Sequence, residues 1–345
     1  MNASPRHLID LIGLDRDWVL ARFAEADRLR AARGTARAPR PMAGRTAALV
    51  FHKPSLRTRV SFTVGMHELG GDVVDLSAVE VSETGRESLP DVARVLSSMV
   101  DLIVVRTFAH RIVRTLADHS SVPIINALTD FSHPCQVLSD LYTLWRNGRD
   151  LDALTIAWVG DGNNVLHSWL EAATLFGFTL QIGVPDGFEP DAGLFLEAER
   201  RGRLRRVRDP REAVRGADVV YTDTWTSMGH EADADWRRVA FAGYQVNDSL
   251  MALANPGALF MHCLPAHRGE EVTDSVMDGA RSIVVEQAEN RLHLQKALMV
   301  ALAAAGAERA TRSTGKAIAS GPRALTPRVA TRRAARVVEA VAASR

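Results

Sequence analysis

Two arginines and two hydroxyl groups near the start of the chain predict an anion site. The segment FHKPSLRTRVSF (51–62) begins where an apolar run, AALVF (47–51), ends, and that run is expected to be a strand. Ser55 is placed to cap a following helix, and the backbone N–H groups at a helix start favour an anion. Arg57 adds a two-pronged donor suited to phosphate oxygens. Taken alone, the segment is equally well explained as a capped helix with surface arginines.

A second polar segment, DFSHPCQVLSDL (130–141), follows another predicted strand, VPIIN (122–126). Ligands of open α/β sheets gather at the carboxyl ends of strands, which is where His133 and Gln136 fall. A histidine there can donate to a carbonyl oxygen or act as an acid or base. The structural alternative is a helix-capping histidine followed by proline. Arg106 ends a further strand and directs another cation at the same edge.

Two glycines in VGDGNNVLHS (159–168) partly match the dinucleotide fingerprint. After Gly160 and Gly162, the third glycine of that pattern falls at 165, where the chain has Val165. A partial match of this kind is weak evidence for a dinucleotide. The two consecutive asparagines in the stretch indicate side-chain amides reaching a polar ligand, and the chain has no Walker A sequence.

Two further polar segments follow predicted strands in the second half of the chain. In TDTWTSMGHE (222–231), Asp223 and Ser227 can hold an ammonium or the backbone groups of an amino acid, or they belong to an ordinary polar loop. In MHCLPAHRGEEV (261–272), Cys263 is either a small buried hydrophobe or an active-site thiol. Because no CxxC or His-rich spacing lies nearby, a zinc site is not expected.

Short β-branched runs alternate with amphipathic stretches along most of the chain. The predicted strands are 47–51, 72–76, 102–106, 122–126, 155–160, 179–184, 218–222, 258–262 and 282–286. Alternating strands and helices imply parallel sheets that are covered on both faces. The predicted fold class is therefore α/β, with two doubly wound domains, each a mostly parallel sheet flanked by helices, joined by interdomain helices.

The polar stretch WRNGRDLDAL (145–154) separates two strand–helix series and predicts a domain boundary. Residues 1–146 are expected to form one domain and residues 147–288 a second. A first helical signal covers 7–34. A last helix at 289–306 is expected to pack back on the first domain and tie the halves together.

Charge is unevenly distributed along the 345 residues. The whole chain has a formal net charge of +1, but residues 307–345 carry nine Lys/Arg and two Asp/Glu, so the preceding 306 residues are mildly acidic. An acidic body gives no reason to expect nucleic acid as a partner. The basic tail is expected to be disordered, with a weakly supported basic amphipathic helix as the alternative.

The sequence also predicts a cytoplasmic protein. It has two cysteines, too few for a disulfide framework, and its N-terminus lacks a long apolar stretch. The longest apolar run, ALMVALAAAGA (297–307), is too short to span a bilayer.

Taken together, these segments resemble the carbamoyltransferase family, and in particular its ornithine-specific branch. SLRTR resembles the family's S-T-R-T-R motif for carbamoyl phosphate, and HPCQ matches its second phosphate-side motif. DTWTSMG and HCLPAHRGEEV look like the ornithine-specific pair. The likeness covers roughly residues 5–305, in order and at family-like spacing.

The resemblance implies that carbamoyl phosphate and L-ornithine react to give L-citrulline and phosphate, a step of arginine metabolism. It also implies a homotrimer or a multiple of trimers, with active sites between subunits, and neither a metal nor an organic cofactor. Membrane and nucleic-acid partners are not expected.

The site residues implied by the resemblance fall into two groups. Those expected at carbamoyl phosphate are Ser55, Leu56, Arg57, Thr58, Arg106, His133, Gln136, Cys263, Leu264 and Arg291. Those expected at ornithine are Asn164, Asp223, Ser227 and Met228. Those expected to act in catalysis are Arg106, His133, Cys263 and Asp223, and either Asp223 or Cys263 can be the acceptor of the amine proton.

Two departures from the family pattern concern the phosphate side. Leu56 stands where threonine is more usual, and relatives that use acetylated or succinylated ornithine also show leucine there. In SETGRES (82–88), Ser82 stands where ornithine enzymes commonly have a glutamine that reaches the neighbouring subunit. Serine is shorter, and Arg86 in the same loop is a second candidate donor.

These departures keep alternative functions open. One is a carbamoyltransferase for N-acetylornithine, N-succinylornithine or putrescine, although the SMG sequence favours a free α-amino acid. Aspartate is disfavoured as the substrate by HCLP in place of an H-P-L-P sequence. A catalytically impaired relative, or a protein that binds nucleic acid through its tail, is the non-enzyme alternative.

Overall fold

The computed structural model describes residues 5–77, 81–83, 85–227 and 231–319, with the backbone alone at 231 and 308–319. Residues up to Gly306 form one compact unit, which contains both sheets, and residues 307–345 form a second. Met228 and residues 320–345 of the tail lie outside the described part of the chain.

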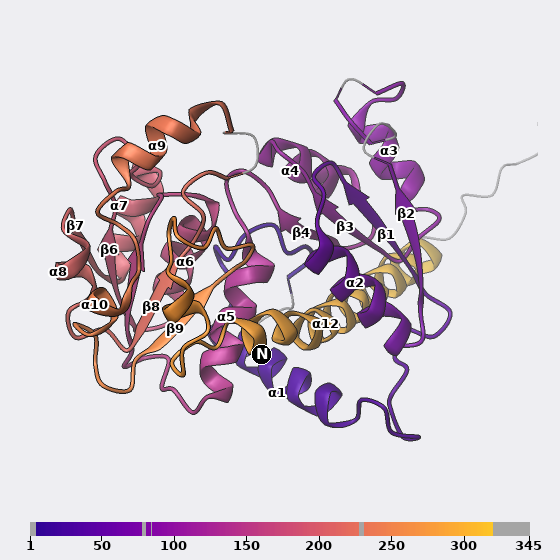
Figure 1. The fold of residues 1–345 in the computed structure, drawn as a ribbon. Helices are drawn as coiled ribbons and strands as arrows, with labels where there is room; N and C mark the ends of the chain where they lie inside the picture. The colour runs from indigo at the N-terminus through magenta and orange to yellow at the C-terminus, as the bar shows by residue number, and fades with distance from the viewer. Residues whose placement is uncertain (1–4, 78–80, 84, 228–230, 320–345) are drawn as a thin grey trace, which may run out of the picture. The chain divides into compact units, whose positions relative to one another are not determined.

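The first sheet is built from the N-terminal half of the chain (Figure 1). Its strands are β1 (Thr46–Phe51), β2 (Asp72–Leu76), β3 (Leu102–Arg106) and β4 (Ile124–Leu128). They pair in parallel in the order β2-β1-β3-β4. The helices of this half are α1 (Arg16–Ala31), α2 (Leu56–Glu68), α3 (Leu89–Leu96), α4 (His110–His119) and α5 (Pro134–Arg146).

Both faces of this sheet are buried, as the continuous apolar runs of its strands predict. Along β1, Ala47 and Leu49 belong to a core cluster shared with α1, α2 and α5. Ala48 and Val50 belong to a separate cluster on the opposite face, shared with α3 and α4. Alternate side chains of one strand therefore attach helices to both faces of the sheet.

The second sheet has five strands, all parallel, in the order β7-β6-β5-β8-β9. They are β5 (Thr155–Val159), β6 (Thr179–Gly183), β7 (Arg203–Val207), β8 (Val219–Thr222) and β9 (Leu259–His262). The helices around it are α6 (Asn164–Leu175), α7 (Ala192–Arg201), α8 (Pro210–Val214), η1 (Glu231–Asp233), α9 (Ala234–Ala240), α10 (Asp248–Met251) and α11 (Asp274–Met277). The predicted α/β class with two parallel, helix-flanked sheets is confirmed.

Two helices connect the sheets. α5 lies between them in Figure 1, and α12 (Val284–Ala319) begins beside β9, where Phe260 forms a bridge with Ser282. α12 then packs closely on α2. A Cβ added to Gly65 of α2 would lie only 3.1 Å from Cγ of Lys296 on α12. The close approach of the two helices at Gly65 depends on the missing side chain.

Three strand predictions differ from the structure. The run 282–286 is not a strand: Ser282 makes an isolated bridge and α12 begins at Val284. β4 lies two residues later than 122–126. β7, which the sequence did not predict, is an edge strand of sequence RLRRV with mostly exposed side chains, so it lacks the apolar run on which the prediction depended.

The terminal helices also differ in length from their predictions. Only Arg16–Ala31 of the first helical signal is helix α1, while Leu8 upstream bridges Ile125 of β4. The last helix is longer than 289–306 and continues to Ala319. Its alanine-rich extension contains no proline, the residue that would have ended the helix. No helix in the described ranges is both long and apolar enough to cross a bilayer.

Candidate active site

A cavity of about 960 Å³ lies at the carboxyl ends of strands from both sheets. It is lined by residues that follow β1, β3 and β4 of the first sheet and β5, β8 and β9 of the second. In each sheet the strand order reverses at a central strand, β1 in one and β5 in the other. Crevices at such reversals are the usual ligand sites of open α/β sheets.

Most of the site residues expected from the sequence line this cavity. They are Ser55, Leu56, Arg57, Arg106, His133, Gln136, Asn164, Asp223, Ser227, Cys263, Leu264 and Arg291. Thr58 does not: its side chain is fully buried, and its Oγ1 accepts a hydrogen bond of 2.7 Å from Arg291. Thr58 therefore supports Arg291 from behind rather than facing the cavity.

The segment after β1 forms the helix start that the sequence predicts. Ser55 has extended backbone geometry and its Oγ accepts from the N–H of Thr58 at 3.3 Å, so it is the N-cap of α2. Arg57, the second residue of α2, lines the cavity and is half-buried. Burial lowers the pKa of its guanidinium. Leu56 is 77% exposed, and its side chain adds no polar group to the cavity.

Three of the arginines that line the cavity have no carboxylate partner within the described part of the chain. Among the residues that the structure describes, none of Arg57, Arg106 and Arg291 forms an ion pair with a carboxylate, and each has an unpartnered buried Nε. Burial, together with the charges of Arg291 and Arg57, lowers the pKa of Arg106 to about 10. Positive groups held close together and left unpaired form a strong site for an anion.

His133 lies beside these arginines and is neutral. Burial and the charges of Arg291, Arg106 and Arg57 hold its pKa well below the usual value. Its Nδ1 is buried and has no hydrogen-bond partner among the described residues. A neutral imidazole can donate a hydrogen bond to a polarised carbonyl oxygen without adding a fourth charge.

The loop that carries His133 is held from the other sheet. The backbone N–H of His133 donates to Oγ of Ser168, on α6, at 2.9 Å. Two further contacts from α6 to this loop are Asn164 Nδ2 to the oxygen of Thr129 at 2.5 Å and His167 Nδ1 to the oxygen of Phe131 at 2.8 Å. The helix after β5 thus fixes alternate residues of a loop that follows β4.

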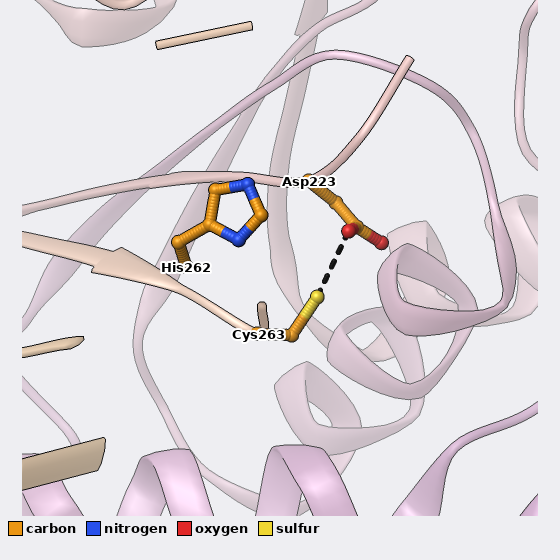
Figure 2. A group of neighbouring side chains, drawn as sticks. All are labelled: Asp223, His262 and Cys263. Atoms are coloured by element: carbon orange, nitrogen blue, oxygen red, sulfur yellow. Dashed lines mark hydrogen bonds between the residues drawn. The ribbon is translucent and has the colours of Figure 1, made fainter. Parts of the chain in front are cut away.

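Asp223 and Cys263, which also line the cavity, form a hydrogen-bonded pair (Figure 2). Cys263 donates to Oδ1 of Asp223 at 2.9 Å, and the N–H of Thr224 donates to the same oxygen at 2.8 Å. Asn163 donates to Oδ2 at 2.7 Å. Burial, with the charge and hydrogen bond of Asp223, raises the pKa of Cys263 well above its usual value, so the thiol keeps its proton.

His262 belongs to the same group but serves the backbone. Its Nδ1 accepts from the N–H of Leu264 at 2.8 Å, and its Nε2 lies 3.2 Å from the buried carboxylate of Glu271. Leu264 has φ of +58°, an uncommon conformation for a residue other than glycine. Both ring nitrogens are occupied, so Asp223, His262 and Cys263 form a hydrogen-bonded set rather than a preformed metal centre.

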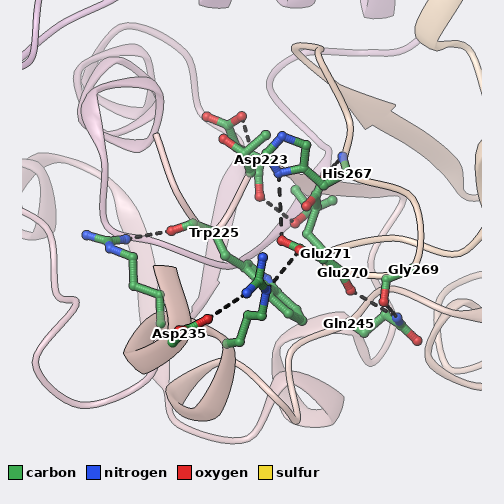
Figure 3. A network of polar contacts seen from close by, with 12 residues as sticks. Asp223, Trp225, Asp235, Gln245, His267, Gly269, Glu270 and Glu271 are labelled. Atoms are coloured by element: carbon green, nitrogen blue, oxygen red, sulfur yellow. Dashed lines mark hydrogen bonds and ion pairs between the residues drawn. The ribbon is translucent and has the colours of Figure 1, made fainter. Parts of the chain in front are cut away.

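A second polar network includes several residues that line the cavity (Figure 3). Oε1 of Glu271 accepts from the N–H of His267 at 2.5 Å. Arg237 of α9 donates to Asp161 at 2.8 Å and to the carbonyl oxygen of Trp225 at 2.6 Å. These bonds fix the loop after β8, which leads to Ser227.

Several cavity residues were not predicted from the sequence. Lys53 is almost fully buried, pairs with Asp130 and lies 4.3 Å from the ring centroid of Phe108. Its position two residues before Ser55 was the available signal. Arg237 and Asp161 are 76 residues apart and carry no local pattern. Ser82 is half-buried, Arg86 is exposed, and neither lines the cavity in this chain.

Comparison with known proteins covers nearly the whole described chain. Residues 6–146 match the family model "Aspartate/ornithine carbamoyltransferase, carbamoyl-P binding domain", and residues 152–302 match "Aspartate/ornithine carbamoyltransferase, Asp/Orn binding domain". Ornithine carbamoyltransferase from Chlorobaculum tepidum is 46% identical over 302 residues, which is 86% of this chain and 89% of that protein. The Bordetella pertussis protein of the same name is 50% identical over 260 residues, or 75% and 82% of the two chains.

Solved structures agree with the sequence comparison. Ornithine carbamoyltransferase from Pyrococcus furiosus superimposes with a TM-score of 0.83 at 43% identity, covering 87% of this chain and 97% of that one. The Thermus thermophilus protein gives a TM-score of 0.79 at 42% identity, covering 87% and 99%. With both halves matched and the cavity at their shared strand ends, the chain belongs to the aspartate/ornithine carbamoyltransferase family.

Proposed function

We propose that the protein transfers the carbamoyl group of carbamoyl phosphate to the δ-amine of L-ornithine, giving L-citrulline and phosphate. The observation that carries this proposal is a single cavity whose lining holds two unlike groups. One group is the three arginines without carboxylate partners in the described ranges, and the other is the hydrogen-bonded pair of Asp223 and Cys263. The arginines suit a phosphate anion, and the carboxylate suits an amine.

Of the groups that suit an anion, Arg57 and the start of α2 are assigned to the phosphate. Arg106, His133, Gln136 and Arg291 are assigned to the carbamoyl group and its bridge to phosphate. The amine nitrogen attacks the carbamoyl carbon, and the carbonyl oxygen becomes an oxyanion that Arg106 and His133 stabilise. The C–O bond to phosphate then breaks, and phosphate leaves against the charge of Arg57. The new C–N bond remains in citrulline.

The attacking amine must be neutral. A lysine-like amine has a pKa near ~10.4, so forming the free base at pH 7 costs about 4.6 kcal/mol. One proton of the ammonium leaves for solvent before attack, and a second passes from the nitrogen to the departing phosphate. Asp223 is assigned to hold the amine in place, because the protonated thiol of Cys263 is the weaker acceptor. Both substrates then meet within one cavity, which replaces a bimolecular encounter.

Asn164, Asp223, Ser227 and Met228 are assigned to ornithine, and Cys263 and Leu264 to the space between the substrates. The proposed division is a carbamoyl phosphate domain at 1–146, completed by 289–306, and an ornithine domain at 147–288. The proposed assembly is a homotrimer or a multiple of trimers in the cytoplasm. In that assembly Ser82 and Arg86 are the candidates to reach the neighbouring cavity.

A steady-state panel of amines with carbamoyl phosphate tests the function. L-Ornithine is expected to give a kcat/KM at least about 100-fold above N-acetylornithine, N-succinylornithine, putrescine and L-aspartate, because unmatched polar groups are strongly rejected. Citrulline identified as the product excludes a catalytically impaired relative. A higher kcat/KM for any other amine overturns the choice of ornithine.

A further inference from the structure

A buried carboxylate outside the cavity, Asp140 on α5, lies one turn after Gln136. Asp140 is fully buried and does not line the cavity, whereas Gln136 does. Nε2 of Gln136 is 2.8 Å from Oδ1 of Asp140. Oε1 of Gln136 is buried and has no hydrogen-bond partner among the described residues. Gln136, which is assigned to the carbamoyl group, therefore has its amide nitrogen bonded to Asp140 and its amide oxygen without a partner among the described residues.

The orientation of the Gln136 amide follows from a series of hydrogen bonds that begins at a backbone N–H group on β9. The N–H of His262 can only donate, and it lies 3.0 Å from Oε1 of Gln287 on α12. The NH₂ group of Gln287 must then face the opposite way, toward Oδ1 of Asp140 at 2.8 Å and the hydroxyl oxygen of Tyr221 at 3.1 Å. The backbone N–H of His262 thus fixes the orientation of the Gln287 amide.

The same logic continues through Tyr221 to Gln136. Since the Tyr221 oxygen accepts from Gln287, its own hydrogen points at Oδ2 of Asp140, 2.8 Å away. Burial raises the pKa of Asp140 to about 7, so above that pH the carboxylate is ionised and accepts from every neighbour. In that state Gln136 is left with one arrangement, in which NH₂ faces Asp140 and the oxygen is free.

We propose that Asp140 is a specificity-determining positioning residue, which holds the oxygen of Gln136 free for an N–H of the substrate. This inference rests on the proposed function, because the donor it expects is the NH₂ group of carbamoyl phosphate. An acceptor oxygen in a fixed orientation forms a hydrogen bond with an N–H group of the substrate. Opposite a methyl group the same oxygen stays unpaired. Asp140 therefore makes the site prefer a carbamoyl group over an acetyl group of the same shape.

Acetyl phosphate is the matching probe, since it has CH₃ where carbamoyl phosphate has NH₂. The quantity to measure is a selectivity ratio, the Kd of acetyl phosphate divided by the Kd of carbamoyl phosphate, without ornithine. Asp140→Leu removes the acceptor, frees the Gln136 amide to rotate, and is expected to lower this ratio at least about tenfold. A purely structural role weakens both ligands equally and leaves the ratio unchanged.

Asp140→Asn is the conservative variant. Its oxygen can still accept from both glutamines while its NH₂ faces Tyr221, whose hydroxyl hydrogen then lacks an acceptor. We expect a lower melting temperature but a selectivity ratio within about threefold of wild type. Ser139→Ala, which changes a buried neighbour bonded only within α5, is the matched control and leaves the ratio unchanged.

Gln136→Leu closes the cycle. It is expected to lower the ratio by itself, and Asp140→Leu in that background is expected to lower it no further. Should Asp140→Leu not fold, the wild-type ratio is measured from pH 8.5 to pH 5.5. Protonated Asp140 can donate to Gln136 and reverse the amide, so the ratio is expected to decrease as the pH is lowered.

The outcomes separate the two claims. Wild-type protein that does not bind carbamoyl phosphate contradicts the proposed function. Wild-type protein that binds it, with a ratio unchanged by Asp140→Leu or, where that variant does not fold, by acidification, overturns the role of Asp140 alone. A ratio unchanged by Gln136→Leu also overturns it.

Discussion

The thiol of Cys263 donates its hydrogen bond to the carboxylate of Asp223, with 2.9 Å between Sγ and Oδ1. This direction of donation has a chemical consequence. Burial, and after it the charge and hydrogen bond of the Asp223 carboxylate, raise the pKa of Cys263, so the cysteine lines the cavity as a neutral donor rather than as a nucleophile.

Asp223→Asn is therefore expected to make Cys263 more reactive. Removing the carboxylate lowers the pKa of the thiol, so the thiolate fraction at pH 8 increases, and alkylation by iodoacetamide is expected to accelerate at least about tenfold. The rate is followed by mass spectrometry of the labelled peptide. Cys135, whose pKa burial raises to about 12, is the internal control and stays unlabelled. An unchanged or slower rate at Cys263 would contradict the assigned cause.

Arg57 and Arg59 provide a matched pair on one helix. Arg57 lines the cavity, whereas Arg59 forms an ion pair with Asp75. Arg57→Gln is expected to weaken carbamoyl phosphate binding at least about tenfold, because a charge-assisted hydrogen bond contributes roughly 1.5–3 kcal/mol. Arg59→Gln is expected to change the Kd less than about threefold. Isothermal titration calorimetry gives both values, and equal losses would sink the assignment of Arg57 to the phosphate.

Ser168, on helix α6 beside the second sheet, is expected to affect the binding of carbamoyl phosphate. Ser168→Ala removes the acceptor of the His133 N–H and leaves that buried group unpaired. We expect KM for carbamoyl phosphate to rise about tenfold, with a smaller change in KM for ornithine. Ser139→Ala removes a buried hydroxyl that donates only to Cys135 of its own helix, and both KM values should stay near wild type. If the two variants behave alike, the α6 contact does not position His133.

Glu171 is expected to limit stability in alkaline solution. This buried carboxyl on α6 accepts from the N–H of Leu11 at 2.9 Å, and burial raises its pKa to about 8, with Asp10 and Arg114 as the nearby charges. The unfolded chain loses this proton near pH 4.5 and the folded chain near pH 8, so stability falls as pH rises between these values.

Glu171→Gln keeps an acceptor for Leu11 but cannot ionise. The variant is expected to exceed wild type by roughly 1–3 kcal/mol in free energy of unfolding at pH 8.5, with little difference at pH 5. Urea denaturation at both pH values measures this difference. Glu87→Gln at an exposed position is the control and should change neither value. A pH-independent difference would show that Glu171 does not titrate as described.

Local motifs in the sequence predicted much of the cavity. Ser55 caps α2 as predicted, and Arg57 lines the cavity beside it, because a capped helix start after a buried strand is a local arrangement, set by residues a few positions apart. The strands of both sheets were found from their β-branched runs because parallel strands are buried on both faces. β7 was missed for the opposite reason: its arginines lie on an exposed edge, where solvent rather than packing sets the residue types.

What the sequence by itself determined was which residue types stand at the ends of buried strands, because the period of apolar residues and the capping groups are written locally. Only the tertiary structure decided how those residues use their polar atoms. Thr58 faces Arg291 rather than the cavity, and Asp140 collects donors from residues 81 and 147 positions away. Such partners are set when α5, β8 and α12 pack together, since a buried polar group without a hydrogen bond costs free energy and most such groups pair wherever their partner lies in the chain.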